Sequence, residues 1–181
     1  MSHQPTEDGY AATVVVGNIK PASRTREAGV AVAEACCRHF GTADPIVNVI
    51  ELGELSSTLF GWADSAVENA KRQILESRLL IVASPVYKAS YTGLLKAFLD
   101  QFGRDELGAL ASVPLMVGAG PAHSLAVECH LRPVLIEIGA SCPTRGFYLL
   151  EGEVADIERP IAEWLSVWGD ALEAVVSCRQ K

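Results

Sequence analysis

Hydroxyl, amide and cationic side chains gather directly after the first apolar run of the chain. Residues 11–17 are small or β-branched and uncharged, and five polar residues follow: Asn18, Lys20, Ser23, Arg24 and Thr25. The pattern after Ser23 is helical, so these groups stand at a helix N-terminus, where amides and the helix dipole favour an anion. The segment is neither a Walker loop nor a G-x-G-x-x-G turn. It predicts a monophosphate ligand, and an N-cap with ordinary surface charges is the alternative.

A second candidate loop follows the apolar run at residues 79–84, which is typical of a buried parallel strand. The loop contains Pro85, Val86, Tyr87 and Lys88, and apolar residues at helical spacing come after it. Backbone N–H groups of such a turn can meet the polar edge of a planar heterocycle, while Val86 and Tyr87 offer apolar surface. Lys88 can attract a phosphate or negative charge that develops on a reduced ring. The alternative is a solvent-facing loop.

A third loop with two glycines follows the apolar run at residues 113–118. Gly118, Ala119 and Gly120 allow the backbone to approach a ligand closely, or they form a simple turn. The sequence shows no Ser-His-Asp set, no paired-carboxylate signature and no cluster of metal-ligand residues. We therefore predict no catalytic side chain and no metal site, and we assign the reactive chemistry to a bound cofactor.

Strand-like and helix-like patterns alternate along the chain and would position these loops. Strands are predicted over residues 11–17, 46–50, 79–84, 113–118 and 145–150. Helices are predicted over residues 23–40, 64–77, a stretch that ends near 102, 122–138 and 157–175. This alternation predicts an α/β fold, a flavodoxin-like three-layer sandwich with a five-stranded parallel sheet of order 2-1-3-4-5. In that order the three loops converge on one crevice.

A proline interrupts the predicted helix at residues 122–138. Pro133 has no N–H to donate to the carbonyl of Cys129. We therefore predict a kink or a π-bulge around Cys129 and His130.

Composition and charge exclude several classes of partner. The chain has 181 residues and a formal net charge of −7, which argues against nucleic acid because phosphate contacts need a basic face. No apolar run approaches the length of a membrane span, and the polar residues 1–10 do not form a signal peptide. The five cysteines form no C-x-x-C motif. We predict a cytoplasmic protein with reduced thiols, a disordered arm at residues 1–10 and a single domain at residues 11–181.

The most specific motif is Ser-Pro-Val-Tyr-Lys at residues 84–88, with its continuation Tyr-Thr-Gly-Leu-Leu-Lys at residues 91–96. This motif resembles the NADPH-dependent FMN reductases, in particular the branch that serves two-component sulfonate monooxygenases. The first loop has a similar spacing. Further similar segments are residues 97–100, 122–123, 125–128 and 132–135.

The resemblance implies a role for each loop. The first loop would hold the FMN phosphate, through Asn18, Lys20, Ser23, Arg24 and Thr25. The second would face the isoalloxazine, through Pro85, Val86, Tyr87 and Lys88. The third would close the far side of the ring, through Gly118, Ala119 and Gly120. NADPH or NADH would stack on the flavin and transfer hydride, and reduced FMN would leave for a partner flavin-dependent monooxygenase.

The resemblance also implies a homodimer or homotetramer with a π-helix in the fourth helix, near the interface. Two positions depart from the family pattern. Asn18-Ile19 stands where Ser-Pro is expected, and Glu128-Cys129-His130 stands where the alkanesulfonate reductases carry a tyrosine.

Two other functions fit the same loops. One is a quinone or azo-dye reductase that keeps FMN tightly bound. The other is a flavodoxin-type electron carrier, which passes single electrons from a shielded flavin and needs no nicotinamide site.

Overall fold

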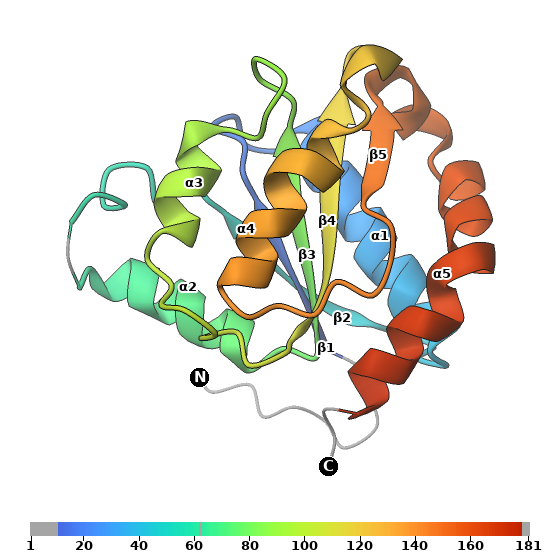
Figure 1. Cartoon of the computed structure of the whole chain (residues 1–181), viewed down its shortest axis with the longest axis horizontal. Coiled ribbons are helices and arrows are strands. Elements are labelled where there is room, and N and C mark those ends of the chain that lie inside the picture. The colour runs from blue at the N-terminus through green and yellow to red at the C-terminus, as the bar shows by residue number, and fades with distance from the viewer. Residues whose placement is uncertain (1–10, 62, 179–181) are drawn as a thin grey trace.

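A parallel five-stranded sheet forms the centre of the molecule (Figure 1). The computed structural model describes residues 11–61 and 63–178, and the predicted arm at residues 1–10 lies outside them. The strands are β1 (Ala11–Val16), β2 (Ile46–Glu51), β3 (Leu79–Pro85), β4 (Ala111–Gly118) and β5 (Phe147–Leu150). Their order is β2-β1-β3-β4-β5 and every pairing is parallel, which confirms the predicted topology.

Helices cover both faces of the sheet, as a three-layer sandwich requires. They are α1 (Arg24–His39), α2 (Ser65–Leu75), α3 (Gly93–Leu99), α4 (Arg132–Glu137) and α5 (Glu158–Cys178). Figure 1 shows α3 and α4 in front of the sheet and α1 behind it. Among residues 11–61 and 63–178, no helix combines the length and the apolar character needed to cross a bilayer.

Helices cover both faces of β3 and β4, and both strands are largely apolar. Every residue of β3 and β4 is buried. Leu80 and Val82 pack with residues of α2, α3 and α4, whereas Ile81 and Ala83 pack with residues of α1 and α5. Successive side chains of a strand point to opposite faces, so one continuous apolar run supplies both halves of the core.

Side-chain caps define the starts of the helices near the three loops. The Ser23 hydroxyl accepts the N–H of Arg26 at 3.3 Å, so Ser23 is the N-cap of α1, the role that the sequence offered as the alternative. Thr92 caps α3 in the same way, because its hydroxyl accepts the N–H of Leu95 at 3.1 Å. Each cap satisfies an amide that has no partner inside its helix.

The fourth helix is shorter than predicted and has a π-helical start. The segment predicted as one helix over residues 122–138 consists of a 3₁₀ turn at Pro121–His123, a π-helix at Val127–Leu131 and α4. The π-helix confirms the irregularity predicted around Cys129 and His130. Pro133 lies in the first turn of α4, where a missing N–H costs least, so the regular helix begins there.

Three cysteines pack in the core as apolar side chains. Cys36, Cys37 and Cys142 are buried thiols that form no disulfide among the described residues. Burial raises the pKa of the Cys37 and Cys142 thiols to about 11, so both stay protonated at neutral pH. Burial likewise raises the pKa of Cys36. Cys36 and Cys37 belong to the core cluster that α1 and α5 form with the sheet.

Candidate functional site

The three predicted loops lie at the carboxyl ends of β1, β3 and β4, which are neighbours in the sheet. The Gly17 N–H donates to the Ala83 carbonyl at 2.7 Å, and the Thr92 hydroxyl donates to the Gly17 carbonyl at 2.7 Å. The Val86 N–H donates to the Val117 carbonyl at 2.8 Å. These bonds join the first loop to the second and the second to the end of β4. The loops therefore share one edge, the position at which open α/β sheets bind ligands.

Two residues of the first loop are buried and hold its shape. Asn18 and Thr25 are 8% and 2% exposed. The Asn18 amide nitrogen donates to the Thr25 hydroxyl at 3.5 Å, and its amide oxygen accepts the Lys20 N–H at 3.1 Å. Such a bond from Asn to an amide two residues on is a common device of turns. Both side chains are therefore engaged within the loop itself.

The exposed polar groups of this loop stand at the N-terminus of α1. Lys20 and Arg24 are exposed, and Ser23 is partly exposed. The first amides of a helix have no partner inside it and point out of its N-terminus. Arg24 Nη1 donates to Glu151 Oε2 at 3.1 Å, and Glu151 begins the 3₁₀ turn Glu151–Asp156 after β5. Amides and two cations at a helix N-terminus suit a phosphate.

A carboxylate beneath the first loop is a residue that sequence analysis missed. Glu51, the last residue of β2, accepts the Ala22 N–H at 3.4 Å and pairs with Arg26 Nε at 3.1 Å through Oε1. Its Oε2 is buried without a partner among the described residues. Ala22 has a φ of 50°, a left-handed conformation that is costly for a residue with a Cβ. Glu51 is 29 residues from Ala22, so no local pattern reveals the contact.

The second loop is a tight turn with a strained tip. Tyr87 and Ser90 exchange two backbone hydrogen bonds of 2.8 and 3.1 Å. Between them, Lys88 and Ala89 have φ values of 52° and 63°. Positive φ at both central residues is typical of a type I′ turn, which usually contains Asn or Gly. Tyr87 is 52% exposed and Lys88 is also exposed, so the turn holds an aromatic ring and a cation at the rim.

Beneath this turn, two hydroxyl groups fix the backbone. Pro85 is buried as the last residue of β3, and Val86 is half-buried. The Ser84 hydroxyl accepts the Thr92 N–H at 3.1 Å and donates to the Pro85 carbonyl at 3.0 Å. Sequence analysis did not single out Thr92, although a threonine before an apolar helical run is a recognisable N-cap signal.

The third loop depends on a tyrosine that sequence analysis also missed. A Cβ at Gly118 would overlap the Tyr148 hydroxyl oxygen, so Gly118 makes room for Tyr148. The Tyr148 hydroxyl donates to the Gly120 carbonyl at 2.6 Å, and burial raises its pKa. A Cβ at Gly120 would meet no atom within 4 Å. Gly120 therefore borders open space, whereas the space beside Gly118 is filled by Tyr148. Ala119, which lies between the two glycines, is exposed.

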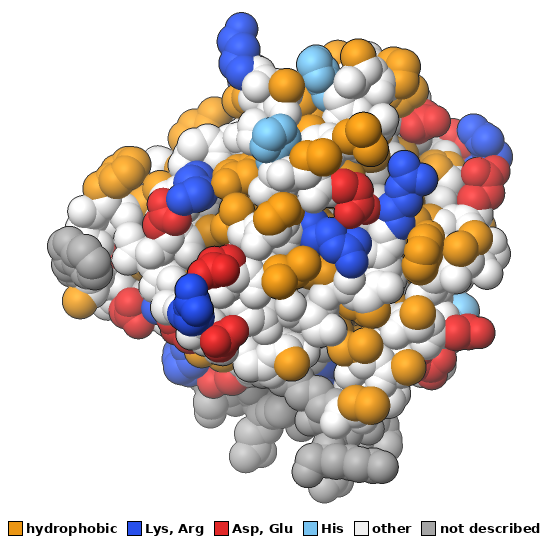
Figure 2. All heavy atoms as spheres, in the orientation of Figure 1, with side chains coloured by type: hydrophobic (Ala, Val, Ile, Leu, Met, Phe, Trp, Pro, Cys, Tyr) orange, Lys and Arg blue, Asp and Glu red, His pale blue; other side chains and the backbone are white. Residues whose placement is uncertain are grey.

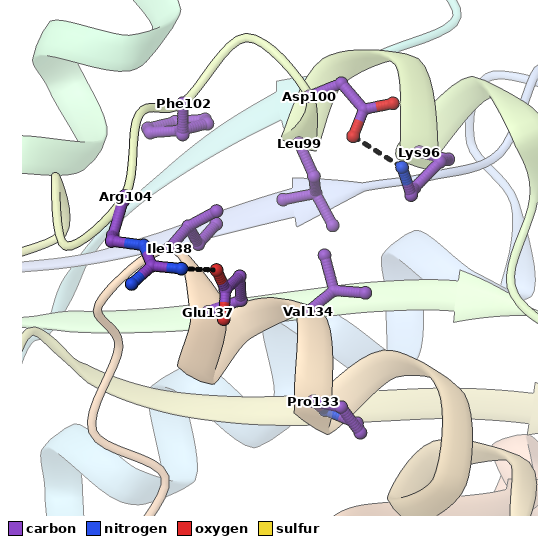
Figure 3. Close-up of a pocket in the computed structure, with 9 residues that line it drawn as sticks. All are labelled: Lys96, Leu99, Asp100, Phe102, Arg104, Pro133, Val134, Glu137 and Ile138. Atoms are coloured by element: carbon purple, nitrogen blue, oxygen red, sulfur yellow. Dashed lines mark hydrogen bonds and ion pairs between the residues drawn. The ribbon is translucent and has the colours of Figure 1, made fainter.

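A groove of about 470 Å³ lies between α3 and α4, away from the three loops (Figure 3). Lys96 pairs with Asp100 at 2.5 Å and Arg104 pairs with Glu137 at 3.1 Å along its sides. Leu99 and Val134 line it between these pairs. Figure 2 shows hydrophobic and charged side chains interspersed over the same face of the molecule. None of the predicted loop residues lines this groove, and we place the candidate site at the loops because they follow the carboxyl ends of neighbouring strands.

Residues 11–154 match the model of the NADPH-dependent FMN reductase family. The chain belongs to this family. This FMN reductase is an NAD(P)H:FMN oxidoreductase, and it uses FMN together with a reduced nicotinamide nucleotide. The resemblance found in the sequence is confirmed.

Three relatives show how far the similarity extends. An NADH-dependent FMN reductase, SfnF, from Pseudomonas putida is 31% identical over 140 residues, which cover 75% of this chain and 74% of SfnF. An FMN reductase (NADPH) from Escherichia coli (strain K12) is 37% identical over 99 residues, which cover 54% of this chain and 52% of the relative. The apo structure of an NADH:FMN oxidoreductase, EmoB, has a TM-score of 0.74 at 30% identity, covering 93% of this FMN reductase and 89% of EmoB.

The loops of this FMN reductase have the donors and the space that FMN requires. Helix amides with Lys20 and Arg24 fit a phosphate. Val86 and the exposed ring of Tyr87 fit a planar aromatic ring, and a Cβ at Gly120 in the third loop would meet no atom within 4 Å. The residues present therefore fit a phosphorylated aromatic ligand, with a charged end at α1 and an apolar end at the second loop.

Proposed function

We propose that the three loops form the FMN site, that FMN binds there as a dissociable substrate, and that reduced FMN passes to a partner flavin-dependent monooxygenase. The proposed site consists of Asn18, Lys20, Ser23, Arg24, Thr25, Pro85, Val86, Tyr87, Lys88, Gly118, Ala119 and Gly120. The observation that supports it most is the hydrogen bonding that joins Thr92 to Gly17 and Val86 to Val117. A single ligand could contact all three loops across this edge.

The charged end of the site supports phosphate binding. Arg24 and Lys20 reach solvent beside the N-terminus of α1, and a helix N-terminus with cations stabilises an anion. Asn18, Thr25 and Glu51 hold the loop from beneath through their own contacts. In this proposal these contacts keep the backbone of the loop in place for the phosphate.

The apolar end of the site supports ring binding. The turn at Tyr87–Ser90 presents a half-exposed phenol ring and the ammonium of Lys88. A cation beside the ring would stabilise the negative charge of a reduced flavin. When bound, FMN supplies the acceptor for the hydride of the nicotinamide, so the chain needs to bind and orient its two substrates.

The exposed residues of the proposed site support exchange of bound flavin with free flavin in solution. Lys20, Arg24, Tyr87 and Lys88 are all exposed, and the described residues include no segment that covers them. A partner monooxygenase is supported by the Ser-Pro-Val-Tyr-Lys motif, which resembles the branch that serves sulfonate monooxygenases.

Steady-state oxidation of NADPH and of NADH, with and without added FMN, tests the activity. We expect turnover that depends on FMN and saturates with it. Absence of flavin-dependent turnover with either nicotinamide would exclude this function.

The alternatives give different outcomes in the same preparation. A quinone or azo reductase with tightly held FMN would remain yellow after extensive dialysis and would reduce quinones faster than free FMN. A flavodoxin-type carrier would leave the flavin spectrum unchanged when NADPH is added without oxygen.

We also propose a homodimer or homotetramer in the cytoplasm, formed by one domain at residues 11–181. Two exposed apolar side chains support an interface at the fourth helix, because Leu125 before the π-helix and Ile136 in α4 are 60% and 51% exposed. Cys129 and His130 are exposed on the π-helix that precedes α4, where the family resemblance implies an interface. The cysteines form no disulfide among the described residues, which supports a reducing compartment. Light scattering after size-exclusion chromatography tests the assembly, and a monomer would contradict it.

A further inference from the structure

The ion pair between Arg24 and Glu151 joins the start of α1 to the segment that follows β5. Arg24 Nη1 and Glu151 Oε2 are 3.1 Å apart, although the residues are separated by 127 positions. The two side chains are 64% and 50% exposed. Arg24 is the first residue of α1, at the N-terminus where the proposed phosphate site lies. A carboxylate of the protein therefore occupies part of the donor set that a phosphate would use.

Both arginines of this loop are paired with glutamates, but the two pairs differ in character. The Glu51 side chain is 13% exposed, and its Oε1 accepts the Ala22 N–H in addition to pairing with Arg26. Separating that pair would leave a buried carboxylate without a cation, which is costly. Arg24 and Glu151 are both solvated, so separating them costs little. Arg24 can therefore release Glu151 and bind another anion, whereas the Arg26–Glu51 pair helps to hold the loop in its conformation.

A flavin phosphate is a stronger partner for Arg24 than Glu151 is. Phosphate carries more negative charge than a carboxylate at neutral pH and accepts charge-assisted, bidentate hydrogen bonds from a guanidinium. The same helix N-terminus would stabilise it through amides and the dipole. Glu151 would then be displaced into solvent, so binding of the phosphate has to separate the Arg24–Glu151 pair.

We propose that Glu151 acts as an internal competitor for the FMN phosphate, which lowers the affinity for FMN and makes the flavin exchangeable. This inference rests on the proposed function, because it requires the FMN phosphate at the start of α1. Glu151 weakens the binding of a phosphorylated flavin and has no effect on riboflavin, which has the same ring and no phosphate. Glu151 therefore lowers the ratio of FMN affinity to riboflavin affinity, which makes it a specificity-determining residue.

The experiment compares the wild type with Glu151→Gln in equilibrium titrations of oxidised FMN and of riboflavin, without nicotinamide. Flavin fluorescence or calorimetry gives the dissociation constants. We expect Glu151→Gln to bind FMN about three- to tenfold more tightly and to bind riboflavin as the wild type does. Glu76→Gln is the matched control, because Glu76 forms an exposed pair with Arg72 at the far end of α2. It should leave both constants unchanged.

A double-mutant cycle tests whether Arg24 carries the effect. In an Arg24→Ala background, Glu151→Gln should change the FMN dissociation constant by less than about twofold, because the guanidinium for which Glu151 and the phosphate compete has been removed. Glu151→Ala should reproduce Glu151→Gln, and thermal unfolding should show that both variants are folded. If Glu151→Ala and Glu151→Gln change the FMN affinity equally, the change comes from the lost carboxylate charge and not from a local change of shape.

Three results would overturn the inference while leaving the FMN site in place. These are an unchanged FMN affinity in Glu151→Gln, an equal tightening of riboflavin, and a full effect in the Arg24→Ala background. Failure of the wild type to bind FMN would instead overturn the proposed function, and with it this inference.

Discussion

The first and second loops lie side by side at one edge of the sheet but are held by different means. Buried side chains hold the first loop, since Asn18 bonds Thr25 and Lys20, and Glu51 bonds Ala22. The backbone holds the tip of the second loop, where Tyr87 and Ser90 exchange two hydrogen bonds. The proposed phosphate end is thus shaped by side chains from beneath, and the proposed ring end by a turn that projects outward.

This difference predicts different sensitivities to mutation. A side-chain framework fails when one buried polar partner is removed, because the other is left unsatisfied. A turn that is held by backbone hydrogen bonds tolerates the loss of a side chain. Its stability depends instead on how readily its central residues adopt positive φ. Binding should divide in the same way, with phosphate contacts at the first loop and ring contacts at the second.

Removal of the Thr92 hydroxyl should have the largest effect, because it joins the two loops. Thr92→Val keeps the shape but leaves the Gly17 carbonyl and the Leu95 N–H without their partner. We expect the free energy of unfolding to fall by about 2–3 kcal/mol, measured by urea denaturation. Thr92→Ser, which retains the hydroxyl, should remain close to wild type. Equal stability of the Val variant would show that other contacts join the loops.

Arg24→Ala should affect the phosphate end alone. We expect FMN binding to weaken by about 1–2 kcal/mol, because a charge-assisted hydrogen bond to phosphate is lost. Riboflavin affinity should stay the same in a parallel titration. An unchanged FMN affinity would remove Arg24 from the site.

Tyr87→Ala should affect the ring end alone. We expect FMN and riboflavin to lose about 1 kcal/mol each, because an aromatic contact to the common ring is lost. Circular dichroism should be unchanged, since Tyr87 is 52% exposed. A loss confined to FMN would contradict the division between the two ends.

Ala89→Gly should have the smallest effect and the opposite sign. Ala89 has a φ of 63°, which glycine adopts without a Cβ clash. We expect the variant to gain about 0.5–1 kcal/mol of stability in urea denaturation. Ala171→Gly is the control, because Ala171 is an exposed residue within α5 and glycine should destabilise a helix there. A destabilised Ala89→Gly would show that the turn is not strained.

The family motif and the periodicity of the sequence determined most of the fold and the location of the candidate site. Apolar runs predicted the strands, and their alternation with helices predicted the order β2-β1-β3-β4-β5. Ser23 marked the start of α1, and Pro133 marked the π-helix before α4. These features depend on neighbours within a few residues, through helix periodicity, capping and the missing N–H of proline.

Only the tertiary structure decided which side chains complete the three loops. Glu51 reaches the first loop across 29 positions, Tyr148 reaches the third across 28, and Glu151 reaches Arg24 across 127. The space beside the Gly118 Cα holds the Tyr148 hydroxyl, a contact that the sequence did not reveal. Such contacts arise when strands far apart in the sequence end at the same edge of the sheet. The residue types in these contacts give no local signal. A glutamate or tyrosine at the end of a strand can have many different partners, and only the folded chain determines which one it contacts.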